Sequence, residues 1–176
     1  MPLATVLPEV PDAFSPLEQT KVYLYTTTTP FVNPAAPTRS EINAGVDITA
    51  QIAEWSGFTI ATEFIDIPNI ANKFVSRIGG RITAEDSSIT FHLSESGADI
   101  RAHLNADESG VGGAAATKGW LLFADAGDAT GLLADLYPFE VASMGKVRAL
   151  DSNLRITVSV AFRGRFYENI ALPATA

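Results

Sequence analysis

Alternation of apolar and polar residues marks short strands along the chain, and it is clearest near the C-terminus. From Leu154 to Arg163, large apolar side chains occupy every second position, and small polar or basic side chains lie between them. The same two-residue period runs from Ser88 to Ser94, where Ile89, Phe91 and Leu93 share one face. A two-residue period is typical of a strand with one buried face. Both segments are therefore predicted to be strands that cover a core.

Shorter runs of β-branched, aromatic and aliphatic residues predict additional strands. They lie at Lys21–Thr29, Phe58–Phe64, Arg81–Ala84, Gly119–Ala124, Leu132–Val141 and Gly145–Leu150. The last two are separated by a break near Ser143, and Gly79-Gly80 permits a bulge or sharp bend before Arg81. With about eight short strands in total, the pattern predicts a mainly β chain, folded as an antiparallel β-sandwich or barrel.

Two short helical segments are predicted beside these strands. In the first, Thr38 is followed three residues later by Glu41, which is the spacing of a capping box. In the second, Ala98–Leu104, apolar residues four apart share one face, and Ser96 or Glu95 is the expected N-cap. This second segment directly follows a strand, so it is expected to be one short α-helix that flanks the sheet.

One domain is predicted at residues 20–164, because 176 residues suffice for one well-cored domain and are few for two. Residues 1–19 carry prolines at positions 2, 8, 11 and 16, which predicts an extended N-terminal arm. The glycine-rich stretch 105–119 is expected to be a flexible loop, because it lacks the Gly-Lys-Ser/Thr of a phosphate-binding loop. Residues 165–176 are expected to form a short C-terminal tail.

The predicted hairpin loop at residues 65–75 is unusually apolar. Isoleucine, phenylalanine and valine surround Pro68-Asn69, whereas the tip of a solvated hairpin is normally polar. Either another copy of the protein or the chain's own core is expected to cover these residues. The N-terminal arm is also too apolar to be left in water. Together these two segments supply the candidate contact residues Ile65, Ile67, Ile70, Phe74, Leu7 and Phe14.

Charge and cysteine content exclude several classes of protein. Twelve Lys and Arg against 20 Asp and Glu give a formal net charge of −8. Such a chain repels nucleic acid, because binding to phosphate needs cations. The chain has no cysteine, which excludes disulfides, thiolate nucleophiles and cysteine-ligated zinc. It also lacks the pattern of a signal peptide and any apolar run near the roughly 20 residues of a membrane span. We therefore expect a soluble chain without membrane insertion.

Catalytic chemistry has little support in the sequence. The two histidines are His92, on the polar face of its strand, and His103, four residues after Asp99. An Asp and a His at this spacing share a helix face and form half of a metal site or an acid–base pair. Without further His or Cys ligands nearby, a hydrogen bond on the helix surface is the better interpretation. No serine lies in a Gly-x-Ser-x-Gly motif. No catalytic residue, cofactor or metal is therefore predicted.

Several segments, taken in order, carry a resemblance to a known family. They read PTRSEINAGVDIT, then an apolar hairpin, then EDSSITFHLSESGADIRAHL, GWLLF and GKVRALDSNLRITVSVAF. This order resembles the major tail proteins, or tail tube proteins, of long-tailed (siphovirus-type) phages that infect actinobacteria. The resemblance extends from Thr20 to Phe162, and its most specific parts are Asp86–Leu104 and Gly145–Phe162.

The resemblance implies a structural virion protein that is not an enzyme. Its expected fold is a β-sandwich with one flanking helix, and its main partner is itself, in hexameric rings stacked into a tail tube. Four strands of each copy would join those of neighbouring copies in an inner β-barrel. A tape-measure protein, a tail terminator and tail-tip proteins are the other implied partners. Genome DNA would pass through the lumen during ejection without specific binding. The expected location is the virion tail, assembled in the cytoplasm of the bacterial host.

The resemblance also implies roles for particular segments. Phe58–Phe64, Val75–Thr83 and Arg155–Arg163 are expected to be strands on the lumen side, and Ile65–Phe74 is expected to contact the next ring. Candidate residues that face the lumen are Glu63, Asp66, Glu85, Asp86, Thr157 and Ser159.

Three alternatives compete with this interpretation. A tail terminator or a capsid decoration protein is another structural virion component with a similar sandwich. A carbohydrate-binding module would require exposed aromatic residues on one strand face, whereas Trp55 and Trp120 lie among apolar neighbours in the sequence. A small hydrolase using His103 and Asp99 is the weakest alternative.

Overall fold

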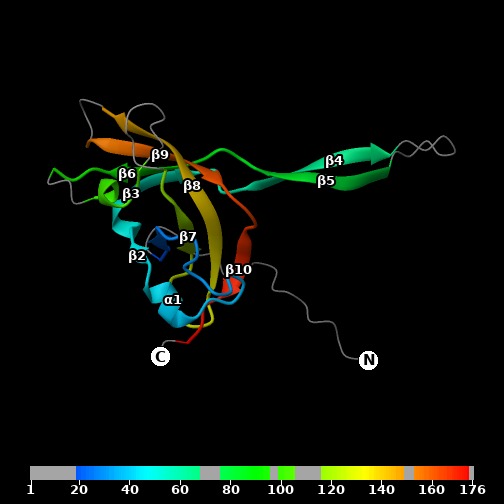
Figure 1. Ribbon diagram of the computed structural model, residues 1–176, viewed down its shortest axis with the longest axis horizontal. Coiled ribbons are helices and arrows are strands. Elements are labelled where there is room, and N and C mark those ends of the chain that lie inside the picture. Colours follow the sequence, from blue (N-terminus) through cyan, green and yellow to red (C-terminus); the bar gives the residue numbers. More distant parts are fainter. Residues whose placement is uncertain (1–18, 68–75, 96–98, 106–115, 149–152, 175–176) are drawn as a thin grey trace, which may run out of the picture.

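A computed structural model describes residues 19–67, 76–95, 99–105, 116–148 and 153–174 (Figure 1). Within these residues the chain is mainly β, and every strand pairing is antiparallel, as predicted. In chain order the elements are β1 (Lys21–Tyr25), α1 (Arg39–Asn43), β2 (Val46–Asp47), the 3-10 turn η2 (Thr49–Gln51), β3 (Ile52–Ser56), β4 (Ile60–Ile67), β5 (Ser76–Ala84), β6 (Ser87–His92), the 3-10 turn η3 (Ile100–Ala102), β7 (Lys118–Ala124), β8 (Leu133–Val147), β9 (Arg155–Phe162) and β10 (Tyr167–Ala171).

The long strand β8 joins two half-sheets. Its first part pairs with β7 on one edge and with β10 on the other, and its second part pairs with β9. One half-sheet has the order β2-β1-β7-β8, with β10 beyond β8; the other has the order β8-β9-β6-β3. A register shift between Val141 and Ser143 marks the change from one to the other. A bulge increases the bend and twist of a strand, so it helps β8 to serve both half-sheets.

The main core lies where the two half-sheets face each other. Apolar side chains of β1 and β7 meet those of β6, β8 and β9, and the largest fully buried ones include Phe91, Phe139 and Leu121. Each large apolar side chain removed from water contributes about 1.5–3 kcal/mol to folding. The period-2 prediction for the strand at 88–94 is confirmed, because Ile89 and Phe91 are buried.

A second core lies on the opposite face of the β1-β7-β8 half-sheet. Ile42 of α1 packs there with Phe31, Leu122 and Leu136. The predicted capping box is present: the amide of Glu41 donates to Thr38 Oγ1, and the Glu41 carboxylate accepts from the Thr38 amide at 2.7 Å. Glu41 accepts a second amide hydrogen bond, from Val32, and these bonds hold the pKa of its carboxyl below the usual range. This short helix is therefore fixed both by its cap and by one buried side chain.

Three predictions about the elements are wrong. The expected break near Ser143 is a bulge within the continuous strand β8, because β9 pairs along Ser143–Val147 and keeps it extended. The expected C-terminal tail contains β10, which pairs with β8. The segment expected as an α-helix at Ala98–Leu104 contains the 3-10 turn η3, and its N-cap is Asp99, whose side chain accepts from the amide of Arg101. Among the described residues, the flanking α-helix is α1.

The backbones of β1 and β7 lie close together at Gly119. A Cβ at Gly119 would overlap the carbonyl oxygen of Tyr25 and lie 3.3 Å from Cε1 of Phe139. We predict that Gly119→Ala lowers the free energy of unfolding by about 1–3 kcal/mol, because the strands must separate to admit the methyl group. Urea denaturation of the free subunit measures this change.

The matched control is Gly145→Ala in β8, where no atom lies within 4 Å of the added Cβ. This variant is expected to stay within about 1 kcal/mol of the parent protein. Equal destabilisation by both substitutions would contradict the prediction.

Candidate intermolecular surface

The hairpin of β4 and β5 projects from the body of the molecule (Figure 1). These two strands pair with each other and, among the described strands, with none of the main sheet. The register shifts where Thr62 pairs with Ile82 but Phe64 pairs with Gly79, so the predicted bulge lies at Gly80–Arg81. All eight residues of β4 are exposed. A lone two-stranded hairpin is at best marginally stable in water, so this one requires other contacts.

Large apolar side chains are exposed on both faces of the hairpin. Residues directly opposite each other in an antiparallel pair share a face. Phe64, which is 64% exposed, therefore shares one face with Ile60 and Ile82. Ile65, Ile67 and Ile78 share the other. A contiguous apolar surface of this kind is typical of a contact with another molecule.

The predicted contact residues are only partly described. Ile65 and Ile67 lie side by side on one face of the hairpin and are 54% and 43% exposed. The prediction that the chain's own core covers them is therefore wrong for these two residues. Ile70, Phe74, Leu7 and Phe14 lie outside the described residues.

The outer face of the β8-β9-β6-β3 half-sheet carries small hydroxyl side chains. Strand register aligns Ser143 of β8, Ser159 of β9, Ser88 of β6 and Ser56 of β3 in one row across the four strands. The Oγ atoms of Ser56 and Ser88 are 3.2 Å apart. In the next row the Oγ1 atoms of Thr90 and Thr157 are 3.0 Å apart. The predicted lumen residues Thr157 and Ser159 therefore belong to one hydroxyl face, which we define as Ser56, Ser88, Thr90, Ser143, Thr157 and Ser159; Glu54 of β3 lies opposite Thr90 at its margin.

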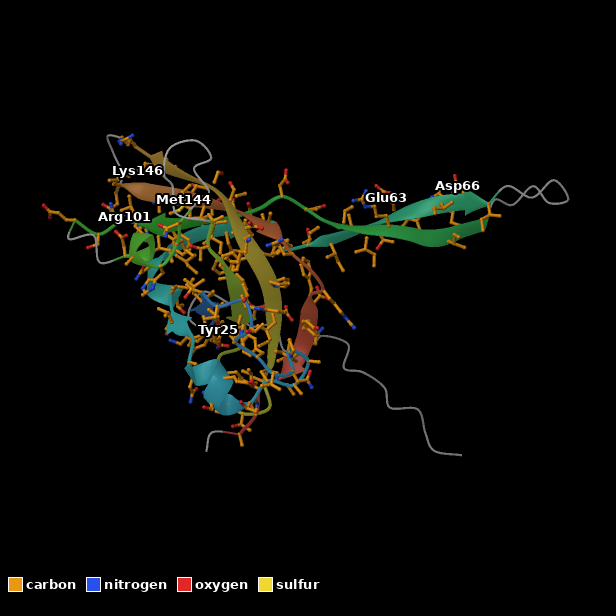
Figure 2. All side chains as sticks on the ribbon, viewed as in Figure 1. Tyr25, Glu63, Asp66, Arg101, Met144 and Lys146 are labelled. Atoms are coloured by element: carbon orange, nitrogen blue, oxygen red, sulfur yellow. The ribbon has the colours of Figure 1, made fainter. Side chains whose placement is uncertain are left out.

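The four predicted acidic lumen residues fall into two groups. Glu85 and Asp86 lie at the base of the hairpin, where they line a hollow of about 850 Å³ together with Ser88 and Ser159. Glu63 and Asp66 lie on the projecting hairpin, at a distance from Met144 and Lys146 of β8 (Figure 2).

The two acids on the hairpin also differ from each other. Asp66 shares the face of Phe64 and pairs with Arg77, whose Nε is 2.7 Å from Asp66 Oδ1. Glu63 shares the opposite face with Ile65. Of the six predicted lumen residues, the structure thus brings Glu85 and Asp86 next to the hydroxyl face and leaves Glu63 and Asp66 apart from it.

A comparison with protein families identifies the class of this molecule. The family model described as phage tail tube protein matches residues 8–175, which is nearly the whole chain. The chain belongs to the phage tail tube protein family. It is therefore a structural protein of the tail, and the mainly β antiparallel fold agrees with this assignment.

Solved structures give a more distant likeness. One match is described as the tail of an empty GTA particle, computed with helical refinement in C6 symmetry. This structure and the present chain share 13% sequence identity. The alignment covers 71% of the present chain and 86% of the matched chain, with a TM-score of 0.46. Because the identity and the TM-score are this low, the match provides no evidence about how the present chain assembles. No curated protein sequence matches the chain.

The hydroxyl half-sheet of this tail tube protein has two free edges. Among the described strands, β3 pairs only with β6, and residues 143–147 of β8 pair only with β9. Trp55 on β3 and Val147 on β8 are 41% and 48% exposed along these edges. Unpaired edges expose backbone donors and acceptors, so they can pair with a strand of another chain.

Asp99 and His103 do not form the predicted pair. The Asp99 carboxylate is buried and accepts from the Ser94 amide at 2.8 Å and from the Arg101 guanidinium at 2.7 and 2.8 Å, while His103 is exposed. Among the described residues, no group of three or more His, Cys, Asp and Glu is placed to hold a metal ion. Those same residues contain no helix that is long and apolar enough to cross a membrane. The Asp99 carboxylate therefore has a structural role after β6, where it links Ser94 and Arg101.

The Asp99 cluster predicts a specific acid sensitivity. Hydrogen bonds from Arg101 hold the pKa of Asp99 well below its usual range, even though burial opposes this shift. Because the pKa is lowered on folding, the stabilisation is complete above the unfolded-state value of about 4 and is lost as the pH falls below it. We predict that Asp99→Asn lowers the melting temperature by several degrees at pH 7 and that the difference shrinks toward pH 2.

Thermal melts of both proteins at pH 7, 4 and 2 measure this effect. The control is Asp86→Asn, which changes an exposed carboxyl and should alter the melting temperature little at any pH. A difference between Asp99→Asn and the parent protein that does not depend on pH would contradict the prediction.

Proposed function

We propose that this tail tube protein assembles into hexameric rings that stack into a tube, the conduit for genome DNA during ejection. The observation that carries the proposal is the projecting hairpin, whose large apolar side chains are exposed on both faces. Burial against other copies removes this surface from water, and the number of six copies per ring follows from the resemblance described above. Membership in the tail tube family supports the tube.

The free edges of the hydroxyl half-sheet support a closed inner barrel. If β3 of one copy pairs with the end of β8 in the next, each copy contributes the four strands β8, β9, β6 and β3. This arrangement keeps Arg155–Arg163 as a lumen strand and replaces the expected strands Phe58–Phe64 and Val75–Thr83, which belong to the hairpin apart from the main sheet. Closure pairs every backbone group that the free edges expose. In this arrangement the hydroxyl face lines the lumen, with Thr157 and Ser159 inward.

The chemistry of that face suits a conduit. Serine and threonine hydroxyls carry no cation, so they supply none of the charge that holds phosphate. At the base of the hairpin, Glu85 and Asp86 line a hollow beside Ser159 together with Arg81, so carboxylates outnumber cations there. The net charge of −8 repels the backbone of DNA as well. DNA would therefore pass without specific binding. Whether Glu63 and Asp66 face the lumen depends on the path of the hairpin in the tube. Their assignment to the lumen therefore stays a prediction.

The hairpin is proposed to contact the next ring through Ile65 and Ile67. Ile70, Phe74, Leu7 and Phe14 stay predicted members of the same contact. We further propose that the tail is that of a long-tailed phage of actinobacteria and that the tube assembles in the host cytoplasm. A tape-measure protein, a tail terminator and tail-tip proteins are its proposed partners there.

Aspartate substitutions in the hairpin test the proposed contact between rings. We predict that the double variant Ile65→Asp, Ile67→Asp folds but forms no tubes, because burying two added charges against an apolar surface is strongly unfavourable. Negative-stain electron microscopy of the purified protein measures assembly, and circular dichroism checks the fold. The parent protein should form tubes or six-fold rings.

The matched control is the double variant Val32→Asp, Ala129→Asp, which places the same two charges at exposed sites of the body, one of them a 96% exposed valine. It should assemble as the parent protein does. Normal tubes from the hairpin variant would show that Ile65 and Ile67 are outside the contact. A parent protein that stays monomeric at high concentration would contradict the proposed function itself.

Lysine substitutions on the hydroxyl face test the proposed lumen. We predict that Thr157→Lys combined with Ser159→Lys gives tubes that retain added double-stranded DNA at low salt and release it at higher salt, because each lysine supplies a phosphate contact. Co-sedimentation of DNA with tubes measures retention. The same two charges at exposed sites away from this face, Ala129→Lys and Val32→Lys, provide the control.

In the control, bound DNA should stay open to nuclease, whereas DNA in the lumen should be protected. Equal nuclease sensitivity in both variants would contradict the assignment of this face to the lumen.

A further inference from the structure

The hairpin joins the body through a sharply bent segment at Gly57–Phe58. Both residues have positive φ angles, 83° for Gly57 and 60° for Phe58. A Cβ at Gly57 would overlap Ser87 Oγ and lie 2.6 Å from the carbonyl oxygen of Asp86. The chain therefore turns here in a conformation that glycine adopts freely and in a space that only glycine fits.

Phe58 has the same left-handed backbone conformation, although its side chain makes that conformation unfavourable. A bulky residue at positive φ is unusual and persists only where its surroundings fix it. The neighbouring residues do fix Phe58. Its ring centroid lies 5.0 Å from that of Phe123 and 5.5 Å from those of Tyr137 and Phe162. These distances are those of favourable aromatic pairs.

The backbone of Phe58 is fixed as well. Its amide donates to Ser87 Oγ at 2.8 Å, and the buried Ser87 hydroxyl donates in turn to the carbonyl of Glu85 at 3.1 Å. One residue further on, Thr59 Oγ1 donates to Glu85 Oε2 at 2.7 Å, and the Glu85 amide donates to the Thr59 carbonyl. The two chain segments that connect the hairpin to the body, at residues 57–59 and 85–87, are thereby hydrogen-bonded to each other. The ring of Phe58 anchors them in the core.

Beyond this joint, the described residues give the hairpin little further support. Its near end, at Ile60, Ile82 and Ala84, lies over a cavity of about 480 Å³. Phe162, Phe166 and Arg165 form the wall of this cavity on the body side. Because a cavity separates these surfaces, the direction of the hairpin depends on the joint rather than on packing along its length.

We propose that Phe58 is a positioning residue for assembly: its ring, held by Phe123, Tyr137 and Phe162, locks the joint and fixes the direction in which the free subunit presents the hairpin. This inference rests on the proposed function, in which the hairpin contacts another copy. Fixing a binding element in its bound direction before contact removes the cost of ordering it during association. If the correct direction were populated only a tenth of the time, apparent affinity would fall about tenfold.

Distance measurements between two spin labels test the proposal in the free subunit. The chain contains no cysteine, so Glu63→Cys on the hairpin and Lys146→Cys on β8 accept labels at defined sites (Figure 2). In this background Phe58→Gly removes the ring and relieves the strain of the backbone. We expect a narrow distance distribution with Phe58 and a distinctly broader one with glycine. Without labels, Phe58→Gly should raise the critical concentration for tube formation about tenfold.

Phe166→Ala is the matched control. Phe166 belongs to the same aromatic cluster, with centroids 5.0 Å from Tyr137 and 4.6 Å from Phe162, but it is not part of the joint. This variant should lower the melting temperature while leaving the distance distribution narrow and the critical concentration unchanged. Phe58→Leu, which keeps an apolar side chain, is the second variant if Phe58→Gly does not fold, and an intermediate broadening is expected for it.

The outcomes separate this inference from the proposed function. A parent protein that forms no tubes contradicts the proposed function. If the parent protein forms tubes and both Phe58 variants keep a narrow distribution and the parental critical concentration, the positioning role of Phe58 is wrong and the proposed function stands. Equal broadening in Phe166→Ala would also overturn the inference, because it would assign the effect to general loss of packing.

Discussion

The pairing of β8 with three strands is the constraint on which the rest of this tail tube protein depends. Because β7, β9 and β10 all form hydrogen bonds with it, the two half-sheets are one continuous sheet that bends at the bulge after Val141. The bend encloses the main core and leaves the hydroxyl face of the second half-sheet exposed. The same geometry leaves β3 and the end of β8 as free edges. Core, outer face and edges are thus consequences of one bent strand.

Local patterns predicted the parts of the fold that depend on local side chains. Alternation in Ser88–Ser94 and in Leu154–Arg163 identified two central strands, and the Thr38–Glu41 spacing identified the cap of α1. The prediction failed where a distant partner decides the conformation. Ser143-Met144-Gly145 is a poor strand on local grounds and is extended because β9 pairs with it. Tyr167–Ala171 lacks alternation and becomes a strand only beside β8.

The candidate intermolecular surface likewise has parts that the sequence predicts and parts that it does not. An apolar sequence around a turn was enough to predict an unusual hairpin, although not whether another copy or the chain's own core covers it; Ile65 and Ile67 are exposed. The row of Ser143, Ser159, Ser88 and Ser56 was not predictable, because it requires the register of strands far apart in the sequence. Nor does any local pattern indicate that Phe58, which reads as an ordinary strand residue, adopts a positive φ. Its role emerges from tertiary packing alone.

The apolar hairpin on a chain of net charge −8 has a thermodynamic consequence for the assembled tail. Burial of apolar surface is driven by entropy near room temperature and weakens on cooling. Repulsion between acidic subunits is screened by salt. In the proposed tube, subunits would therefore join more readily as temperature and ionic strength rise, and the tube would be weakest in cold, dilute solution.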